Sequence, residues 1–128
     1  MVPKTPRRRV VDVQDILTSI CTKWGLLVPY ELSGGVRKHG ELRRVISGVS
    51  QKMLTQTLRT LERDRLVQRT IHPIVPPRVD YALTPLGKTL MPPLSTLYRW
   101  MERHLREVQQ ARRESQKTRR VVGQDRST

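Results

Sequence analysis

Four side chains between Lys52 and Arg63 have the types and the spacing that could read a nucleic acid. Lys52, Gln56, Arg59 and Arg63 follow one another at intervals of four, three and four residues, so they would share one helix face. A glutamine amide can pair with adenine and a guanidinium with guanine, whereas lysine more often meets phosphate. The same pattern is typical of a solvated helix face, so this segment alone leaves both interpretations open.

The helix that would carry these side chains has a defined start and an apolar side. Ser50 is the predicted N-cap, because its hydroxyl can accept a hydrogen bond from a free amide of the first turn. Leu54, Leu58 and Leu61 recur at helical spacing on the side away from the cations. We therefore expect a helix from Ser50 to Arg63 with its leucines packed on a core.

A shorter helical segment and a turn precede this helix. The segment begins near Gly40, and its predicted apolar side consists of Leu42, Val45 and Ile46. Gly48 lies in the turn, where a larger side chain would restrict the backbone. Two helices joined in this way, the second apolar inside and basic outside, predict a helix-turn-helix.

A hairpin follows the two helices. Residues 67–71 are predicted to form one strand and residues 72–77, which contain three prolines, a loop. The next strand alternates, with Val79, Tyr81 and Leu83 on one side. A helix-turn-helix followed by a hairpin is typical of a winged helix, and residues 36–39 could add a short strand. The cations and the histidine that we expect to contact DNA backbone or a minor groove from the wing and its flanks are Lys38, Arg43, Arg69, His72 and Arg78.

Apolar stripes mark helices at both ends of the chain. One begins after Asp12 and is interrupted at Pro29, so we expect two consecutive helices, or one kinked helix, ending near Leu32 and packed in the core. The other begins at Thr84-Pro85, an N-cap followed by proline, and extends to Val108. Pro92 and Pro93 should kink or restart that helix. A stripe of this length favours packing against a second copy of the chain.

Composition limits the partners and the compartment. The chain has 128 residues and a formal net charge of +14, which favours a polyanion such as nucleic acid or an anionic membrane surface. No apolar run is long enough to span a bilayer, the basic N-terminus lacks a secretory apolar core, and one cysteine cannot form an internal disulfide. We expect a cytoplasmic, nucleoid-associated protein with a disordered basic arm (1–10), one domain (11–110) and a disordered basic tail (111–128).

Enzymatic and metal-binding signatures are not found in the sequence. It has no phosphate-cradling glycine loop, and no serine, histidine and acid occur in a recognisable catalytic spacing. Its histidines, His39, His72 and His104, are scattered. We therefore predict no enzyme, no cofactor and no metal site.

An ordered set of motifs from Cys21 to His104 resembles the HxlR-type winged helix-turn-helix regulators, relatives of the MarR type. The resemblance implies an α+β, mainly α, fold with dimerisation helices at both ends of the chain. The residues that carry it are Lys23-Trp24, Gly40-Glu41-Leu42-Arg43, Ile46 to Leu54 with Leu58 and Leu61, Leu66-Val67 with Arg69, Pro76 to Tyr81, Leu83 to Gly87, and Trp100.

The same resemblance implies a bacterial homodimer that binds operator DNA, most often as a repressor. The recognition helix would be the segment from Ser50 to Arg63, and its expected DNA-contacting residues are Ser50, Gln51, Lys52, Thr55, Gln56, Arg59 and Arg63. The expected dimer contacts are Ile16, Leu17, Leu94, Leu97, Trp100, Met101, Leu105 and Val108.

Three positions depart from the pattern of the family. His39 stands where phenylalanine is common, and Arg65 stands where glycine is common, at the end of the recognition helix. A left-handed residue there would cost a non-glycine side chain about 1 kcal/mol. Several family members sense oxidants through an N-terminal cysteine, but Cys21 is not at that position. We expect Cys21 to be a buried structural thiol, with a redox switch as the alternative. The effector of the regulator, a small molecule or an oxidant, is left open.

Two other functions fit parts of the sequence. A nucleoid- or RNA-associated protein would bind nucleic acid through charge alone and show no operator preference at any salt concentration. A protein-interaction module would dimerise without binding DNA. The basic outer side of the helix after Ser50 argues against the second of these.

Overall fold

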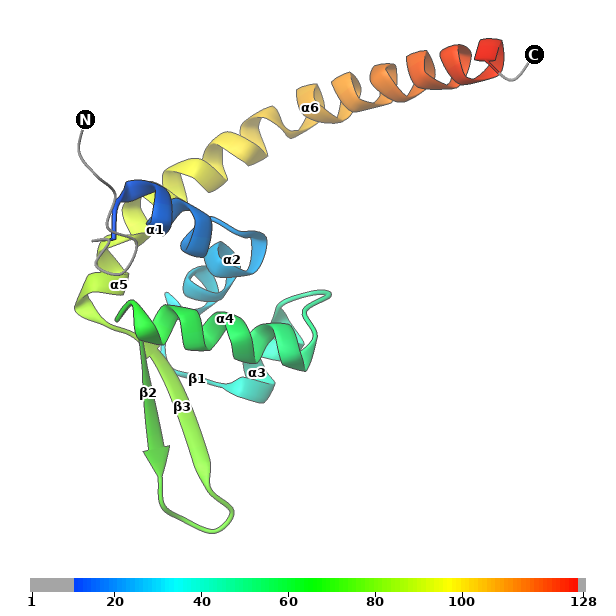
Figure 1. The fold of residues 1–128 in the computed structure, drawn as a ribbon. Coiled ribbons are helices and arrows are strands. Elements are labelled where there is room, and N and C mark those ends of the chain that lie inside the picture. The colour runs from blue at the N-terminus through cyan, green and yellow to red at the C-terminus, as the bar shows by residue number, and fades with distance from the viewer. Residues whose placement is uncertain (1–10, 127–128) are drawn as a thin grey trace, which may run out of the picture. The chain divides into compact units, whose positions relative to one another are not determined.

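A computed structural model describes residues 11–126, with side chains through residue 120. The chain divides into two units, one up to Met91 and one from Pro92, and each is considered by itself. The elements in chain order are α1 (Val13–Ile20), α2 (Lys23–Leu32), β1 (Arg37–Lys38), α3 (His39–Val45), α4 (Gln51–Arg63), β2 (Val67–His72), β3 (Arg78–Leu83), α5 (Pro85–Thr89) and α6 (Met91–Arg126) (Figure 1).

The predicted helix-turn-helix is present as α3 and α4. Ser50 caps α4, with its hydroxyl accepting a hydrogen bond from the Met53 amide at 3.0 Å. Leu54, Leu58 and Leu61 are buried on one side of α4, as predicted. They form one core with residues of α1, α2, α3 and the sheet, so burial of the leucine side fixes which face of α4 is left outside.

The connection between α3 and α4 also follows the sequence. Gly48 has a φ of +85°, a conformation that glycine adopts without a steric penalty. Leu42 and Ile46 are buried in the core as expected, whereas Val45 is exposed. Val45 is the last residue of the short helix α3, and the chain turns away immediately after it.

The first two helices are separated at a different place from the predicted one. The break lies at Cys21 and Thr22, because the Thr22 hydroxyl caps α2 by accepting the Gly25 amide at 2.9 Å. Pro29 lies inside α2, so the prediction that it interrupts the helix was wrong, although α2 does end at Leu32. The apolar stripe of α1 is not core either, since only Ile20 of this helix is buried.

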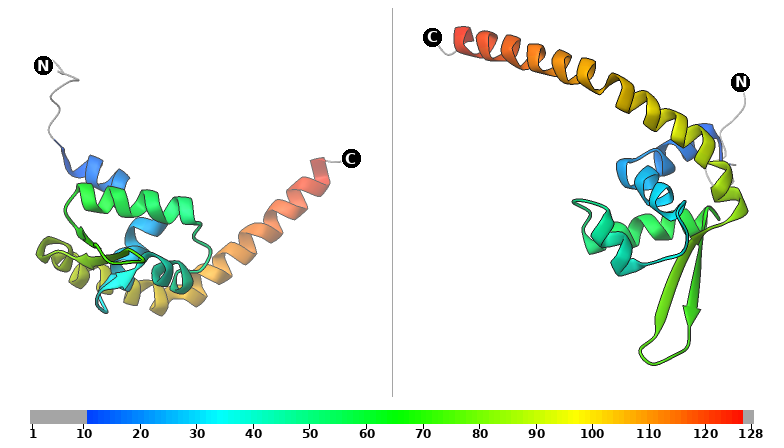
Figure 2. Two further views of the ribbon diagram at one scale, coloured as in Figure 1. Left: turned by 90° about the horizontal axis from the view of Figure 1, so that it is seen from below. Right: turned by 180° about the vertical axis from the view of Figure 1, so that it is seen from behind.

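The three strands form one antiparallel sheet in the order β1-β3-β2. Val67 pairs with Leu83 at the base of the β2–β3 hairpin, and His72 pairs with Arg78 at its far end. β1 adds the short pairing of Arg37 with Tyr81. Figures 1 and 2 show the hairpin, the wing, projecting beyond α3 and α4 of the same unit.

The second unit is the helix α6. Pro92 and Pro93 lie in its first turn, where a missing amide breaks no helical hydrogen bond, so the helix restarts there after α5. The prediction of a disordered tail from residue 111 was wrong, because α6 continues to Arg126 as one uninterrupted helix (Figure 2). Alanine, arginine, glutamate and glutamine are good helix formers, and Gln110 donates to Glu114 four residues on. The expected basic arm, residues 1–10, lies outside the described residues.

Candidate nucleic-acid interface

The outer face of α4 carries the side chains that the sequence singled out. Lys52, Gln56 and Arg59 are all exposed, opposite the buried leucines. An open concavity of about 730 Å³ lies over this face, which we call the α4 outer face, and its lining residues are Gln51, Lys52, Thr55, Gln56 and Arg59.

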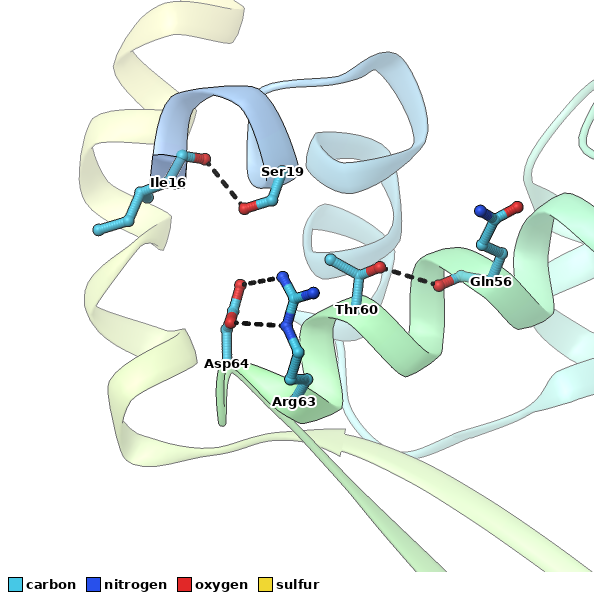
Figure 3. A network of polar contacts seen from close by, with 6 residues as sticks. All are labelled: Ile16, Ser19, Gln56, Thr60, Arg63 and Asp64. Carbon is cyan, nitrogen blue, oxygen red and sulfur yellow. Dashed lines mark hydrogen bonds and ion pairs between the residues drawn. The ribbon is translucent and has the colours of Figure 1, made fainter. Parts of the chain in front are cut away.

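Side chains on the α4 outer face differ in whether they already have partners. In the described part of the chain, Lys52, Gln56 and Arg59 make no side-chain hydrogen bond or ion pair, so their polar groups are available to a ligand. Arg63 is different, because its guanidinium pairs with Asp64 at 3.2 Å at the end of α4 (Figure 3). Figure 3 also shows Thr60 donating to the Gln56 backbone carbonyl, which leaves the amide of Gln56 unused.

Thr55 is held from the side by His39. The His39 Nε2 and Thr55 Oγ1 atoms are 3.0 Å apart, which joins the start of α3 to the middle of α4. Burial lowers the pKa of His39, and the nearby guanidinium of Arg43 lowers it further. The imidazole also lies at a tilt against the ring of Tyr81, with 6.5 Å between centroids. The sequence marked His39 only as a departure from the family and gave no sign of this contact.

Each basic residue predicted on the wing has an acidic neighbour. Arg69 Nε lies 3.2 Å from Glu62 Oε2 on α4. Asp80 of β3 contacts both His72, at 2.9 Å, and Arg78, at 3.5 Å. Contact with phosphate would therefore require these side chains to share or exchange their partners.

The two remaining predicted backbone contacts lie near the wing and on α3. Lys38 borders an open recess of about 440 Å³ that Arg78 and Pro77 also line. Arg43 is exposed on α3.

The wing also has an apolar tip, which the sequence analysis did not single out. Ile71, Ile74 and Val75 are exposed, and Val75 is 99% accessible to solvent. The three prolines of residues 72–77 predict a loop, but they do not indicate that its apolar side chains are exposed. The tip therefore offers a contact surface of a different kind from the paired cations beside it.

Most of the expected dimer contacts are exposed apolar side chains in the single chain. Ile16 and Leu17 are exposed on α1, as are Leu97 and Leu105 on α6. Leu94 is the exception, because it is only 3% accessible and has little surface left to give to a second copy. The other exposed members on α6 are Trp100, Met101 and Val108.

Cys21 is exposed at the end of α1, so the expectation of a buried structural thiol was wrong. Within the described range, no three histidine, cysteine, aspartate or glutamate residues gather closely enough to hold a metal ion. No helix in that range combines the length and the apolar character needed to cross a membrane.

Comparison with known proteins gives a consistent result. The model of the HxlR-like helix-turn-helix family matches residues 19–109. The HTH-type transcriptional regulator YtfH of Escherichia coli K12 is 41% identical over 95 residues, which are 74% of this chain and 75% of that protein.

Solved structures agree with this assignment. The transcriptional regulator ytfH from Salmonella typhimurium matches with a TM-score of 0.72 at 38% identity, covering 77% of this chain and 88% of that one. The redox regulator HypR in its reduced form matches with a TM-score of 0.70 at 36% identity, covering 77% and 97%. With the three-stranded sheet and the capped α3–α4 pair, these matches establish a winged helix-turn-helix. The chain therefore belongs to the HxlR-like helix-turn-helix family and is a DNA-binding transcriptional regulator.

Proposed function

We propose that this regulator acts as a homodimeric repressor that places the α4 outer face of each protomer in a major groove. The observation that carries the proposal is that Lys52, Gln56 and Arg59 are exposed together and have no partner among the described residues. Gln56 and Arg59 would read base edges, with Gln51 beside them, because amide and guanidinium groups pair with adenine and guanine. Lys52 would hold phosphate.

The remaining polar contacts would position the protein without reading sequence. Ser50, Thr55 and Arg63 have roles within the fold, as cap, His39 partner and Asp64 partner, and would reach phosphate from the ends and side of α4. Lys38, Arg43, Arg69, His72 and Arg78 would add backbone contacts around the wing. Such contacts fix the orientation of the protein on the duplex.

Dimerisation would use the exposed apolar residues of α1 and α6. A single apolar helix face of this length is costly to leave in water, and a second copy would cover it. Two-fold symmetry predicts an inverted-repeat operator with half-sites roughly 34 Å, about one helical turn, apart. The protein would work in the cytoplasm at the nucleoid.

The proposal assigns no effector. HypR is a redox regulator by name, and thiol chemistry in this chain could act only through Cys21, its single cysteine. A disulfide would therefore have to join two chains or a chain and a small thiol.

Selection of duplexes from a random pool, followed by binding measurements on two variants, tests the proposal. Arg59→Ala should relax preference at one base pair, costing about 1–3 kcal/mol there, whereas Lys52→Ala should weaken all sequences alike. If selection enriches no sequence, the sequence-independent alternative is correct. If both variants bind every duplex as the wild type does, α4 is not the reading helix.

The oligomeric state needs its own variant. Leu105→Glu puts a charge into the exposed apolar face of α6, whereas Gln110→Glu puts the same charge on the opposite side of the helix. Sedimentation should show a dimer for the wild type and for Gln110→Glu, and dissociation for Leu105→Glu. A wild type that sediments as a monomer at the concentrations used for DNA binding would overturn the dimer.

A further inference from the structure

One face of α6 carries a regular row of cations, which we call the basic stripe. Its positions recur at alternating intervals of four and three residues, so they follow one side of the helix. All of these side chains are exposed in the described structure. The stripe consists of Arg99, Arg103, Arg106, Arg113, Lys117 and Arg120, with Gln110 at the one uncharged step.

The cations of the basic stripe make no ion pair with an acid among the described residues. Glu107 contacts His104 at 3.0 Å, and Glu114 accepts a hydrogen bond from Gln110 at 3.1 Å. Glu102 lies on the stripe side, between Arg99 and Arg106, but it makes no ion pair with either in the described structure. Arg99 and Arg113 donate only to neutral groups, the Thr96 hydroxyl and the Gln110 amide oxygen. This contrasts with the wing, where each cation has an acidic neighbour.

The basic stripe lies on the opposite side of α6 from its apolar residues. Leu97, Met101, Leu105 and Val108 follow their own row at intervals of four, four and three. A 3.6-residue period places that row about half a turn from Arg99, Arg106 and Arg113. A second copy packed on the apolar row would therefore leave the stripe facing solvent.

We propose that the basic stripe is a second DNA-binding surface, which holds the phosphate backbone of duplex DNA without reading its sequence. From Arg99 to Arg120 it extends about 32 Å at 1.5 Å per residue. Duplex DNA carries one phosphate per roughly 1.7 Å of axis, so several phosphates lie within that length. The choice of DNA as the polyanion rests on the proposed function. The stripe itself extends past the family match, which ends at residue 109, because it continues to Arg120.

A matched pair of double variants tests the stripe. Arg113→Gln with Arg120→Gln removes two stripe cations. Arg112→Gln with Arg119→Gln removes the same charge from the same turns, in line with Leu105 and away from the stripe. Affinity for the selected operator and for a scrambled duplex is measured from 50 to 200 mM salt, with sedimentation showing that each variant is still assembled as the wild type is.

The stripe variant should flatten the salt dependence on both duplexes, while the control variant should change it by less than half as much. Each phosphate that is no longer bound lowers the slope of log K against log salt by about 0.9, or about threefold in affinity over this range. Equal slopes for the two variants would overturn the proposal. So would a stripe variant that binds both duplexes as the wild type does but loses binding to vesicles of phosphatidylcholine and phosphatidylserine, which would assign the stripe to an anionic membrane.

The two proposals fail separately in this experiment. The ratio of operator to scrambled affinity reports on the α4 outer face, and the salt slope reports on the stripe. A wild type without operator preference whose slope still falls in the stripe variant would retain the stripe as a DNA surface and reject the operator-reading role of α4.

Discussion

Arg69 Nε lies 3.2 Å from Glu62 Oε2, which joins the first strand of the wing to the side of α4. The pair borders a recess of about 240 Å³ that Arg59 and Tyr81 also line. Burial raises the pKa of the Tyr81 phenol, and of the nearby charges Arg69 has the largest effect, in the opposite direction. Glu62 therefore lies beside Arg59, which we expect to read a base, and it pairs with Arg69 of the wing.

Glu62→Gln should tighten DNA binding with little change in stability. The two side chains are 39% and 47% exposed, so the ion pair is expected to contribute less than about 1 kcal/mol to the free energy of unfolding. Without it, Arg69 becomes available to phosphate, and the slope of the salt dependence should steepen by about 0.9 for each additional phosphate that the protein neutralises. Fluorescence anisotropy with a labelled duplex measures the affinity and its salt dependence.

Glu31→Gln on α2 makes the same charge change away from α4 and the wing, and serves as the control. It should give the smaller change in slope that one unit of net charge produces. If the two variants behave alike, Arg69 does not reach DNA when it is released.

His39 should make stability depend on pH. Because burial, and then Arg43, lower its pKa from 6.5 in the folded protein, the unfolded chain binds the proton more tightly. The free energy of unfolding that neutral His39 contributes is therefore complete above pH 6.5, the ordinary pKa of histidine. It is lost as the pH falls from there through the lowered pKa of the folded state. Urea unfolding one unit above and one unit below that value should show a larger loss for the wild type than for His39→Gln, whose amide can still contact Thr55. Equal losses would show that His39 does not carry the effect.

The sequence was sufficient to predict the helix-turn-helix because its determinants are local. Ser50 as a cap, Gly48 as a turn residue and leucines at helical spacing each act within a few residues, and all three have the predicted roles. The partners of the wing cations were not predictable in this way. The pairing of Arg69 with Glu62 depends on how β2 packs against α4, and no pattern within one element encodes it.

The errors at the two ends of the chain have the same origin. Thr22 and Pro29 each indicate a helix boundary. The boundary lies at Thr22, whose side chain caps α2. Pro29 is accommodated near the end of α2, where the helix packs in the core. From residue 111 onward α6 has no apolar periodicity, so only propensity and neighbouring side-chain pairs indicate a helix. The first outcome sets a cap of about 1 kcal/mol against a proline penalty of about 3 kcal/mol that packing must offset. The second depends on helix propensities below about 0.7 kcal/mol per residue, and a sequence pattern resolves neither balance.

Arg65→Gly should stabilise the protein. Arg65 has a φ of +58°, and a non-glycine residue pays about 1 kcal/mol in this left-handed region. Glycine removes that strain but gains freedom in the unfolded chain, so the expected net gain is up to about 1 kcal/mol. Arg59→Gly, the same substitution in the interior of α4, should instead cost about 1 kcal/mol. Thermal and urea unfolding measure both, and a destabilised Arg65→Gly would show that the arginine side chain contributes more than its backbone strain removes.

Gly87→Ala should destabilise the fold through backbone contact. A Cβ at Gly87 would lie 2.1 Å from the Leu66 carbonyl oxygen and 3.1 Å from Leu83 Cδ2, so α5 would have to move away from the strand ends it packs against. Overpacking of this kind costs about 1–3 kcal/mol, and contact with a backbone oxygen should place the loss at the upper end. Gly40→Ala is the matched control, since none of the described residues has an atom within 4 Å of its Cβ position in α3. Alanine there should stabilise the helix by about 0.5–1 kcal/mol. Equal effects of the two substitutions in urea unfolding would mean that α5 does not approach the Leu66 carbonyl as closely as this geometry requires.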